Sequence, residues 1–247
     1  MNLEHYQALY IGYAAAMAGW FLALRIRPNV WPLTAPRFPQ PWREIGYVLL
    51  AALAVLGIGQ IHTNVYHLPN GGRWGPALES VNQAVIFSPL FVLLWLRGHG
   101  LDTIWLPKKS VPIRLLAGAV LSLIALFAFT LTKSGLGAFP SVLREVYTVA
   151  HSRQLAQVFF EDVAIAMMMV RFTAALRSPW LAAIIVGLLF AGGHIPTMIS
   201  EGVNAKEFTG LIFDFVLATG IVRVLQRAAD IWWFWPVHFT MDMTQFV

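Results

Sequence analysis

The chain has 247 residues, of which 58% are hydrophobic and only 12% are charged, and its mean hydropathy is +0.65. Soluble domains carry about 25% charged residues, so this composition excludes an ordinary soluble domain and predicts a polytopic membrane protein. We assign the net charge of +5 to basic loops that set membrane topology rather than to nucleic-acid binding, and the absence of cysteine excludes disulfides, thiolate chemistry and lipidated cysteines.

Hydrophobic stretches recur along the chain and predict an all-α transmembrane helical bundle of about eight spans. Each span must be a helix, because a segment in the bilayer has to satisfy its own backbone hydrogen bonds. We expect the spans at residues 5–26, 45–62, 80–97, 113–132, 152–175, 180–199, 207–226 and 231–246. The first is not expected to be a signal peptide, because its first basic residue, Arg25, follows the apolar stretch. Residues 1–247 are predicted to form a single transmembrane domain.

Three connecting segments differ in composition from the spans. Residues 27–44 are rich in proline and are not expected to form a long helix. Residues 63–79 carry the turn signals of a loop, and residues 136–151 have the pattern of an amphipathic helix at the membrane interface.

The basic residues are distributed unevenly among the predicted loops. Twelve of the 17 Lys and Arg residues lie in the loops after spans one, three, five and seven or in the span ends next to those loops, and the other five are assigned to the alternate loops. The larger set comprises Arg25, Arg27, Arg37, Arg43, Arg97, Lys108, Lys109, Arg114, Arg171, Arg177, Arg223 and Arg227. The positive-inside rule places this set in the cytoplasm and both chain ends outside.

Ionisable side chains within hydrophobic segments mark the last third of the chain. Glu161 and Asp162 lie in the fifth span, His194 lies in the sixth, and His238 and Asp242 lie in the eighth. An ionisable group in hydrocarbon costs roughly 3 kcal/mol on insertion scales. These groups therefore predict a polar site inside the membrane, built from residue types that serve acid–base catalysis or metal binding.

The local sequence around these residues favours a site, although interhelical hydrogen bonding is the alternative interpretation for the acidic pair. Two glycines precede His194 and Pro196 follows it, which predicts irregular backbone of the kind tolerated where it lines a cavity. His238 and Asp242 are four residues apart and share a helix face, so Asp242 can orient the imidazole or stand beside it. Asp214, in the seventh span, is assigned a structural or substrate-groove role.

The order and spacing of these residues resemble those of the CPBP family, the CAAX-prenyl-endopeptidase and bacteriocin-processing membrane proteases also called the Abi family. The resemblance covers residues 150–247, which would be the catalytic-core helices. The matched positions are Glu161, Asp162, Phe190, His194, His238 and Asp242. Ala166 stands where the family's first motif, Glu-Glu-x-x-x-Arg, has arginine, and Asp242 stands where the third motif most often has asparagine.

The resemblance implies an intramembrane endopeptidase that uses no cofactor or metal. Glu161 and His194 would activate a water molecule for attack on a peptide carbonyl, and His238, with Asp242 beside it, would stabilise the developing oxyanion. Its partners would be the lipid bilayer and a peptide or protein substrate, lipidated substrates included, with no nucleic acid. We expect a multi-pass protein of the cell membrane.

The missing arginine leaves alternatives open. Position 166 shares a helix face with Asp162, so this acid needs a cation from another helix, or is protonated, or belongs to a degenerate site. The alternative functions are a proteolytically silent relative acting as a binding, immunity or scaffold protein, and an enzyme with a divalent metal between Glu161, His194 and His238. The inverted repeat of a transporter is not apparent.

The depth of the site residues predicts the position of the cavity. Glu161 is about ten residues into its span, His194 is in the last third of its own, and Asp242 is near the end of the eighth. All three lie toward the face that bears both chain ends. We therefore expect spans five, six and eight to surround a cavity that opens toward that face.

Overall fold

The described part of the chain is helical. The computed structural model describes residues 3–26, 28, 36–68, 71–200, 202 and 209–247, and these residues form helices and no strands, which confirms the all-α class. The long helices are α1 (Leu3–Ile26), α2 (Pro41–Asn64), α5 (Val111–Lys133), α7 (Gln154–Leu176) and α11 (Gly210–Ala228). The shorter ones are α3 (Gly75–Ile86), α4 (Ser88–Arg97), α6 (Phe139–Val146), α8 (Pro179–Gly193), α9 (Ile195–Ser200) and α12 (Ile231–Met243). Single 3₁₀ turns are η2 (Leu101–Ile104), η3 (Leu136–Ala138), η4 (Val149–Arg153) and η5 (Thr244–Phe246).

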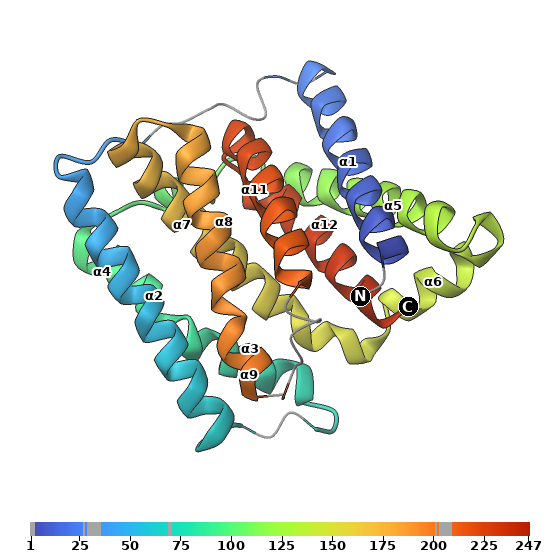
Figure 1. Ribbon diagram of the computed structural model, residues 1–247, viewed down its shortest axis with the longest axis horizontal. Coiled ribbons are helices and arrows are strands. Elements are labelled where there is room, and N and C mark those ends of the chain that lie inside the picture. Colours follow the sequence, from blue (N-terminus) through green and yellow to red (C-terminus); the bar gives the residue numbers. More distant parts are fainter. Residues whose placement is uncertain (1–2, 27, 29–35, 69–70, 201, 203–208) are drawn as a thin grey trace.

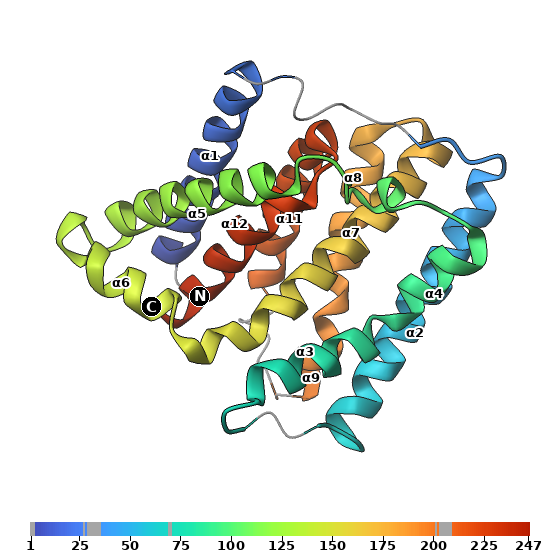
Figure 2. The same ribbon diagram turned by 180° about the vertical axis from the view of Figure 1, so that it is seen from behind.

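Helices α7 and α12 occupy the middle of the bundle. α2, α3 and α8 pack against α7, whereas α5 packs against α12 and α1 crosses α5. Figure 1 shows α2 and α4 at one edge and α1, α5 and α6 at the other, and the reverse view in Figure 2 shows the same division. The acid-bearing helix α7 and the histidine-bearing helix α12 are therefore neighbours at the centre of the molecule.

Close helix contacts at glycine hold the α1, α5 and α12 group together. A Cβ atom built on Gly12 would lie 3.0 Å from the Ala125 carbonyl oxygen. One built on Gly118 would lie 2.9 Å from the Trp233 Cα. Small residues let helix backbones approach in this way, which is the usual packing device in membranes.

Three helices of the described chain are long and apolar enough to cross a bilayer: α1, residues Pro41–His62 of α2, and α5. α3 and α4 would add a fourth as one bent span, because they meet at an angle of 50°. The other helices are less typical spans. α8 and α12 have 15 and 13 residues, fewer than the ~20 that a bilayer requires, and α7 carries three charged residues. The structure thus supports a membrane protein with three or four such helices, fewer than the eight spans predicted.

Several predicted boundaries need correction. The stretch 80–97, predicted as one span, is broken at Phe87 between α3 and α4. Pro89 in the first turn of α4 is the cause, because it cannot donate a backbone hydrogen bond to the preceding turn. The predicted loop 63–79 ends earlier than expected, since α3 begins at Gly75. In the predicted loop 27–44, α2 begins at Pro41, while residues 27 and 29–35 lie outside the described residues.

The predicted amphipathic segment 136–151 contains a helix of that kind. α6 buries Val142 and Val146 against α5 and α12, and it is flanked by η3 and η4. The helix is shorter than the predicted segment.

Candidate functional site

A cavity of about 570 Å³ gathers the ionisable residues of the last third of the chain. It is lined by Glu161 from α7, by Phe190 and His194 from α8 and its end, and by His238 and Asp242 from α12. The prediction that the fifth, sixth and eighth segments surround a common cavity is therefore confirmed. The catalytic roles of these residues stay a prediction.

The cavity lies where the two ends of the chain meet. His5 near the start of α1 and Gln245 in η5 both line it. This position agrees with the expectation from the depth of Glu161, His194 and Asp242 in their segments.

His194 lies at a break between two helices. α8 ends at Gly193, His194 is its C-terminal cap, and α9 begins at Ile195. This is the irregular backbone that the Gly-Gly-His-x-Pro sequence predicts. The His194 Nδ1 lies 2.9 Å from the Phe190 carbonyl oxygen, and the two rings meet edge to face at 4.9 Å. Because a carbonyl only accepts, Nδ1 carries the proton, and Nε2 is left as the basic nitrogen.

His238 is paired with Asp162 rather than with Asp242. The His238 Nδ1 donates to the Asp162 Oδ1 at 2.8 Å, and Asp162 is buried. Of the two expectations for Asp242, that it orients this imidazole is corrected, because Asp162 across the helix interface holds the ring. The other, that Asp242 stands beside His238 in the site, agrees with its position on the cavity wall. Ala166, which replaces the motif arginine, is buried in the core and offers Asp162 no charge. The contact with His238 therefore provides the partner from another helix that Asp162 needs.

Glu161 lines the cavity, and one of its carboxylate oxygens accepts a hydrogen bond. Its Oε1 accepts from the Gln157 Nε2 at 2.9 Å, one helical turn away. No hydrogen bond joins Glu161 directly to His194 within the described residues. A cavity of about 570 Å³ has room for several water molecules, each occupying about 30 Å³. The cavity that both side chains line therefore has room for water.

The described residues give no support to the metal-dependent alternative. They contain no group of three His, Asp or Glu side chains placed to hold a metal ion. Asp214, assigned a structural or groove role, lines the same cavity and accepts a hydrogen bond from the Tyr6 hydroxyl at 3.3 Å.

Sequence reasoning missed the contribution of the first half of the chain. Tyr6 and Tyr13 from α1 and Lys133 from the end of α5 all line the cavity. Tyr6, Tyr10 and Tyr13 recur at the spacing of one helix face in an otherwise apolar segment. That periodic stripe of hydroxyls was the available signal.

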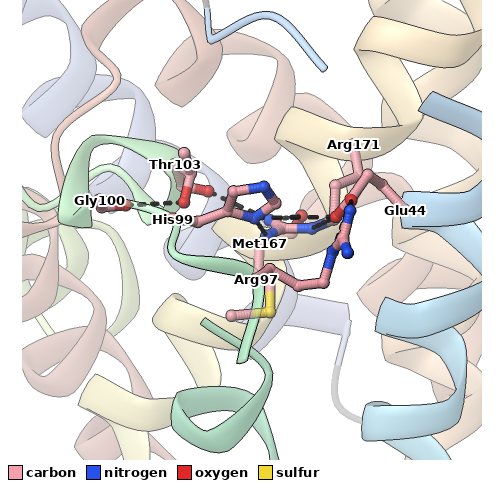
Figure 3. Close-up of polar contacts among 7 residues, drawn as sticks. All are labelled: Glu44, Arg97, His99, Gly100, Thr103, Met167 and Arg171. Atoms are coloured by element: carbon pink, nitrogen blue, oxygen red, sulfur yellow. Dashed lines mark hydrogen bonds and ion pairs between the residues drawn. The ribbon is translucent and has the colours of Figure 1, made fainter. Parts of the chain in front are cut away.

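A second polar cluster, also missed, is buried at the other end of α7 (Figure 3). Arg97 at the end of α4 donates to the Glu44 Oε1 at 2.8 Å and 3.0 Å. The Arg171 Nε lies 3.7 Å from the Glu44 Oε2, and Arg171 also donates to the Met167 carbonyl at 3.1 Å. Both Glu44 and Arg171 are buried. The cluster ties α2, α4 and α7 together.

His99 completes this cluster in its neutral form. The Arg171 Nη2 lies 3.1 Å from the His99 Nδ1, and a guanidinium can only donate, so Nδ1 accepts. His99 lies in the turn between α4 and η2, and burial lowers its pKa against the opposing pull of Glu44. Arg171 was predicted as a loop residue, but it is committed to this cluster and does not reach Asp162.

No family model, curated protein or solved structure matches this chain.

Proposed function

We propose that the chain is an intramembrane endopeptidase of the CAAX-protease kind, acting on peptide or protein substrates within the membrane. The observation that carries this proposal is the common cavity of Glu161, His194 and His238, three residues from three separate segments. Ionisable groups in a membrane are costly unless they serve one another or a substrate. The matched motif positions supply the reaction class.

The geometry supports a different chemical role for each of these side chains. His194, protonated at Nδ1 by its bond to Phe190, presents Nε2 to accept a proton from water, and Glu161 shares in that activation. His238 donates from Nδ1 to Asp162 and, as the imidazolium, donates its Nε2–H to the oxyanion that forms as the water attacks the carbonyl. Collapse of that intermediate breaks the peptide bond, and the proton taken from water passes to the leaving amine.

The C-terminal helices belong in the membrane in this proposal. α7, α8, α11 and α12 surround the cavity and pack on the longer apolar helices, so their polar faces are directed inward. Short helices are tolerated at membrane depth where protein covers their ends. We propose a multi-pass arrangement of up to eight spans in the cell membrane.

Peptidase activity of single variants tests the proposal. Glu161→Ala and His194→Ala should each abolish cleavage of a quenched fluorescent peptide library by protein in lipid vesicles, while the protein still accumulates in the membrane. Removing a water-activating group costs about 10²–10⁴-fold in rate. Asp214→Asn is the matched control, with a milder effect. Equal turnover by the Glu161→Ala protein would refute the glutamate mechanism.

A proteolytically silent binding or scaffold protein is the second candidate. The observation that favours it is that the described part of the chain contains no direct Glu161–His194 hydrogen bond, together with Ala166 in place of the motif arginine. It predicts no cleavage by the unaltered protein under any lipid condition, with peptide binding retained in the Glu161→Ala variant.

A further inference from the structure

An apolar groove lies directly beside the site cavity, between the first turns of α1 and α11. Its volume is about 400 Å³, and its walls are Leu3, Gln7 and Tyr10 on α1 and Ile212, Phe213 and Val216 on α11. Tyr6 lines both this groove and the site cavity. Its side chain is therefore part of the wall that separates them.

Helix α11 presents a different face to each space. Asp214, Leu217 and Ala218 line the site cavity, whereas Phe213 and Val216 line the groove. The groove side is open to the surroundings, since Leu3, Ile212 and Val216 are all exposed. The wall is thus one residue thick at Tyr6, with an apolar outer space and a polar inner one.

The wall at this point is made of side chains. The Tyr6 hydroxyl donates to the Asp214 Oδ1 at 3.3 Å, and its ring lies 5.0 Å from that of Phe213. A Cβ atom built on Gly210 would lie 3.1 Å from the Tyr6 hydroxyl oxygen, so the glycine makes room for this arrangement. Rotation of one tyrosine about its χ1 bond would join the two spaces without moving backbone.

The opposite side of α1 is fixed. It packs on α5 through Gly12 and Gly19, and a Cβ atom on Gly12 would lie 3.0 Å from the Ala125 carbonyl oxygen. Backbone contact of this kind does not open easily. The seam that can open is therefore the one between α1 and α11.

We infer that this seam is the route by which an apolar, membrane-embedded segment of a peptide substrate reaches the site, with Tyr6 and Asp214 as its gate. The inference rests on the proposed function and specifies its substrate class: a peptide bond next to a segment already in the bilayer. The apolar groove accommodates side chains of that segment. As the segment unwinds, its backbone N–H groups lose their helical partners, and the Tyr6 hydroxyl and Asp214 carboxylate replace them at the inner end.

The route is tested by chemical access, independently of catalysis. A cysteine is placed at Leu217, on the cavity face of α11, in this cysteine-free chain. The protein in phosphatidylcholine vesicles is reacted with N-dodecylmaleimide, which partitions into the bilayer, or with a sulfonated, impermeant maleimide. Tyr6→Ala should speed labelling by the dodecyl reagent about tenfold, the factor that one hydrogen bond to a charged group represents.

Matched variants separate gating from a general loosening of the bundle. Tyr147→Phe removes a hydroxyl that lies 2.7 Å from the Thr240 hydroxyl, away from both the groove and the site cavity, so both labelling rates should be unchanged. Tyr6→Phe keeps the ring and should give a smaller increase in the rate of labelling by the dodecyl reagent. This variant replaces Tyr6→Ala in the test if the alanine variant does not accumulate. An equal increase with both reagents, or no increase with the dodecyl reagent, would overturn the route.

The two proposals fail separately. Peptidase activity that survives Glu161→Ala would remove the proposed function and leave the labelling result standing. Loss of activity in Glu161→Ala, with no change in labelling on Tyr6→Ala, would keep the peptidase and remove the access route.

Discussion

The contact between His238 and Asp162 decides how the candidate site is organised. A histidine packed inside an apolar bundle needs a partner, and two acids lie near this one, Asp162 across the helix interface and Asp242 one turn along its own helix. The structure gives the hydrogen bond to Asp162 at 2.8 Å. Adjacent acids on α7 therefore have separate tasks, because residues about 100° apart on a helix face different partners. Glu161 faces the cavity and Asp162 faces α12.

Replacement of Asp162 by asparagine should damage the protein more than the same change at Asp242. Asp162→Asn removes the buried carboxylate that holds His238, and breaking a buried charged pair costs about 3–5 kcal/mol. Thermal unfolding of the purified protein in detergent measures this cost, and Asp242→Asn is the matched control. Equal losses of stability in the two variants would contradict the assignment of Asp162 as the partner of His238.

At the level of elements, α5 and α12 are held together by backbone contact at Gly118. A Cβ atom there would lie 2.9 Å from the Trp233 Cα and 3.0 Å from the Pro236 Cγ. The α12 backbone cannot retreat freely, because Trp233 is fully buried and stacks on Trp20 at 5.5 Å. This packing also fixes the position of α12 relative to α5, and with it the position of His238.

Gly118→Ala should therefore destabilise the protein by about 1–3 kcal/mol, the usual cost of overpacking. Gly220→Ala on α11 is the control, because its Cβ would meet nothing within 4 Å. Alanine at that helix position should be neutral or stabilising by up to about 1 kcal/mol. Thermal unfolding of both variants in detergent gives the comparison, and a stable Gly118→Ala protein would show that α12 can shift away from α5.

The sequence predicted the bounds of the long helices well, but it did not predict which distant residues pair. α1, α5 and α7 begin and end within a few residues of the predicted 5–26, 113–132 and 152–175, because apolar length is a local property of the chain. The break at His194 was also predictable from its glycines and proline. Pairings between distant residues, such as Arg171 with Glu44 or Tyr6 with Asp214, leave no local pattern, since they depend on how whole helices pack.

For the whole molecule, the cavity fixes the relation between the two chain ends and the membrane. Glu4 lies in the first turn of α1 next to His5, and Gln245 lies in η5, while His5 and Gln245 line one cavity. We therefore expect both positions to lie on the same side of the bilayer. Arg114 in the first turn of α5 and Arg171 in the last turns of α7 are buried, yet they stay at the helix ends that adjoin the basic loops. The positive-inside count of twelve among 17 thus still predicts that both chain ends face outward.

Cysteines at Glu4 and Gln245, both exposed, can be probed in intact cells with an impermeant thiol reagent. Labelling of both is the expected result, and labelling of neither until lysis would reverse the orientation but keep the shared side. Labelling of only one would contradict the common cavity itself, and with it the placement of Glu161, His194 and His238 around a single site.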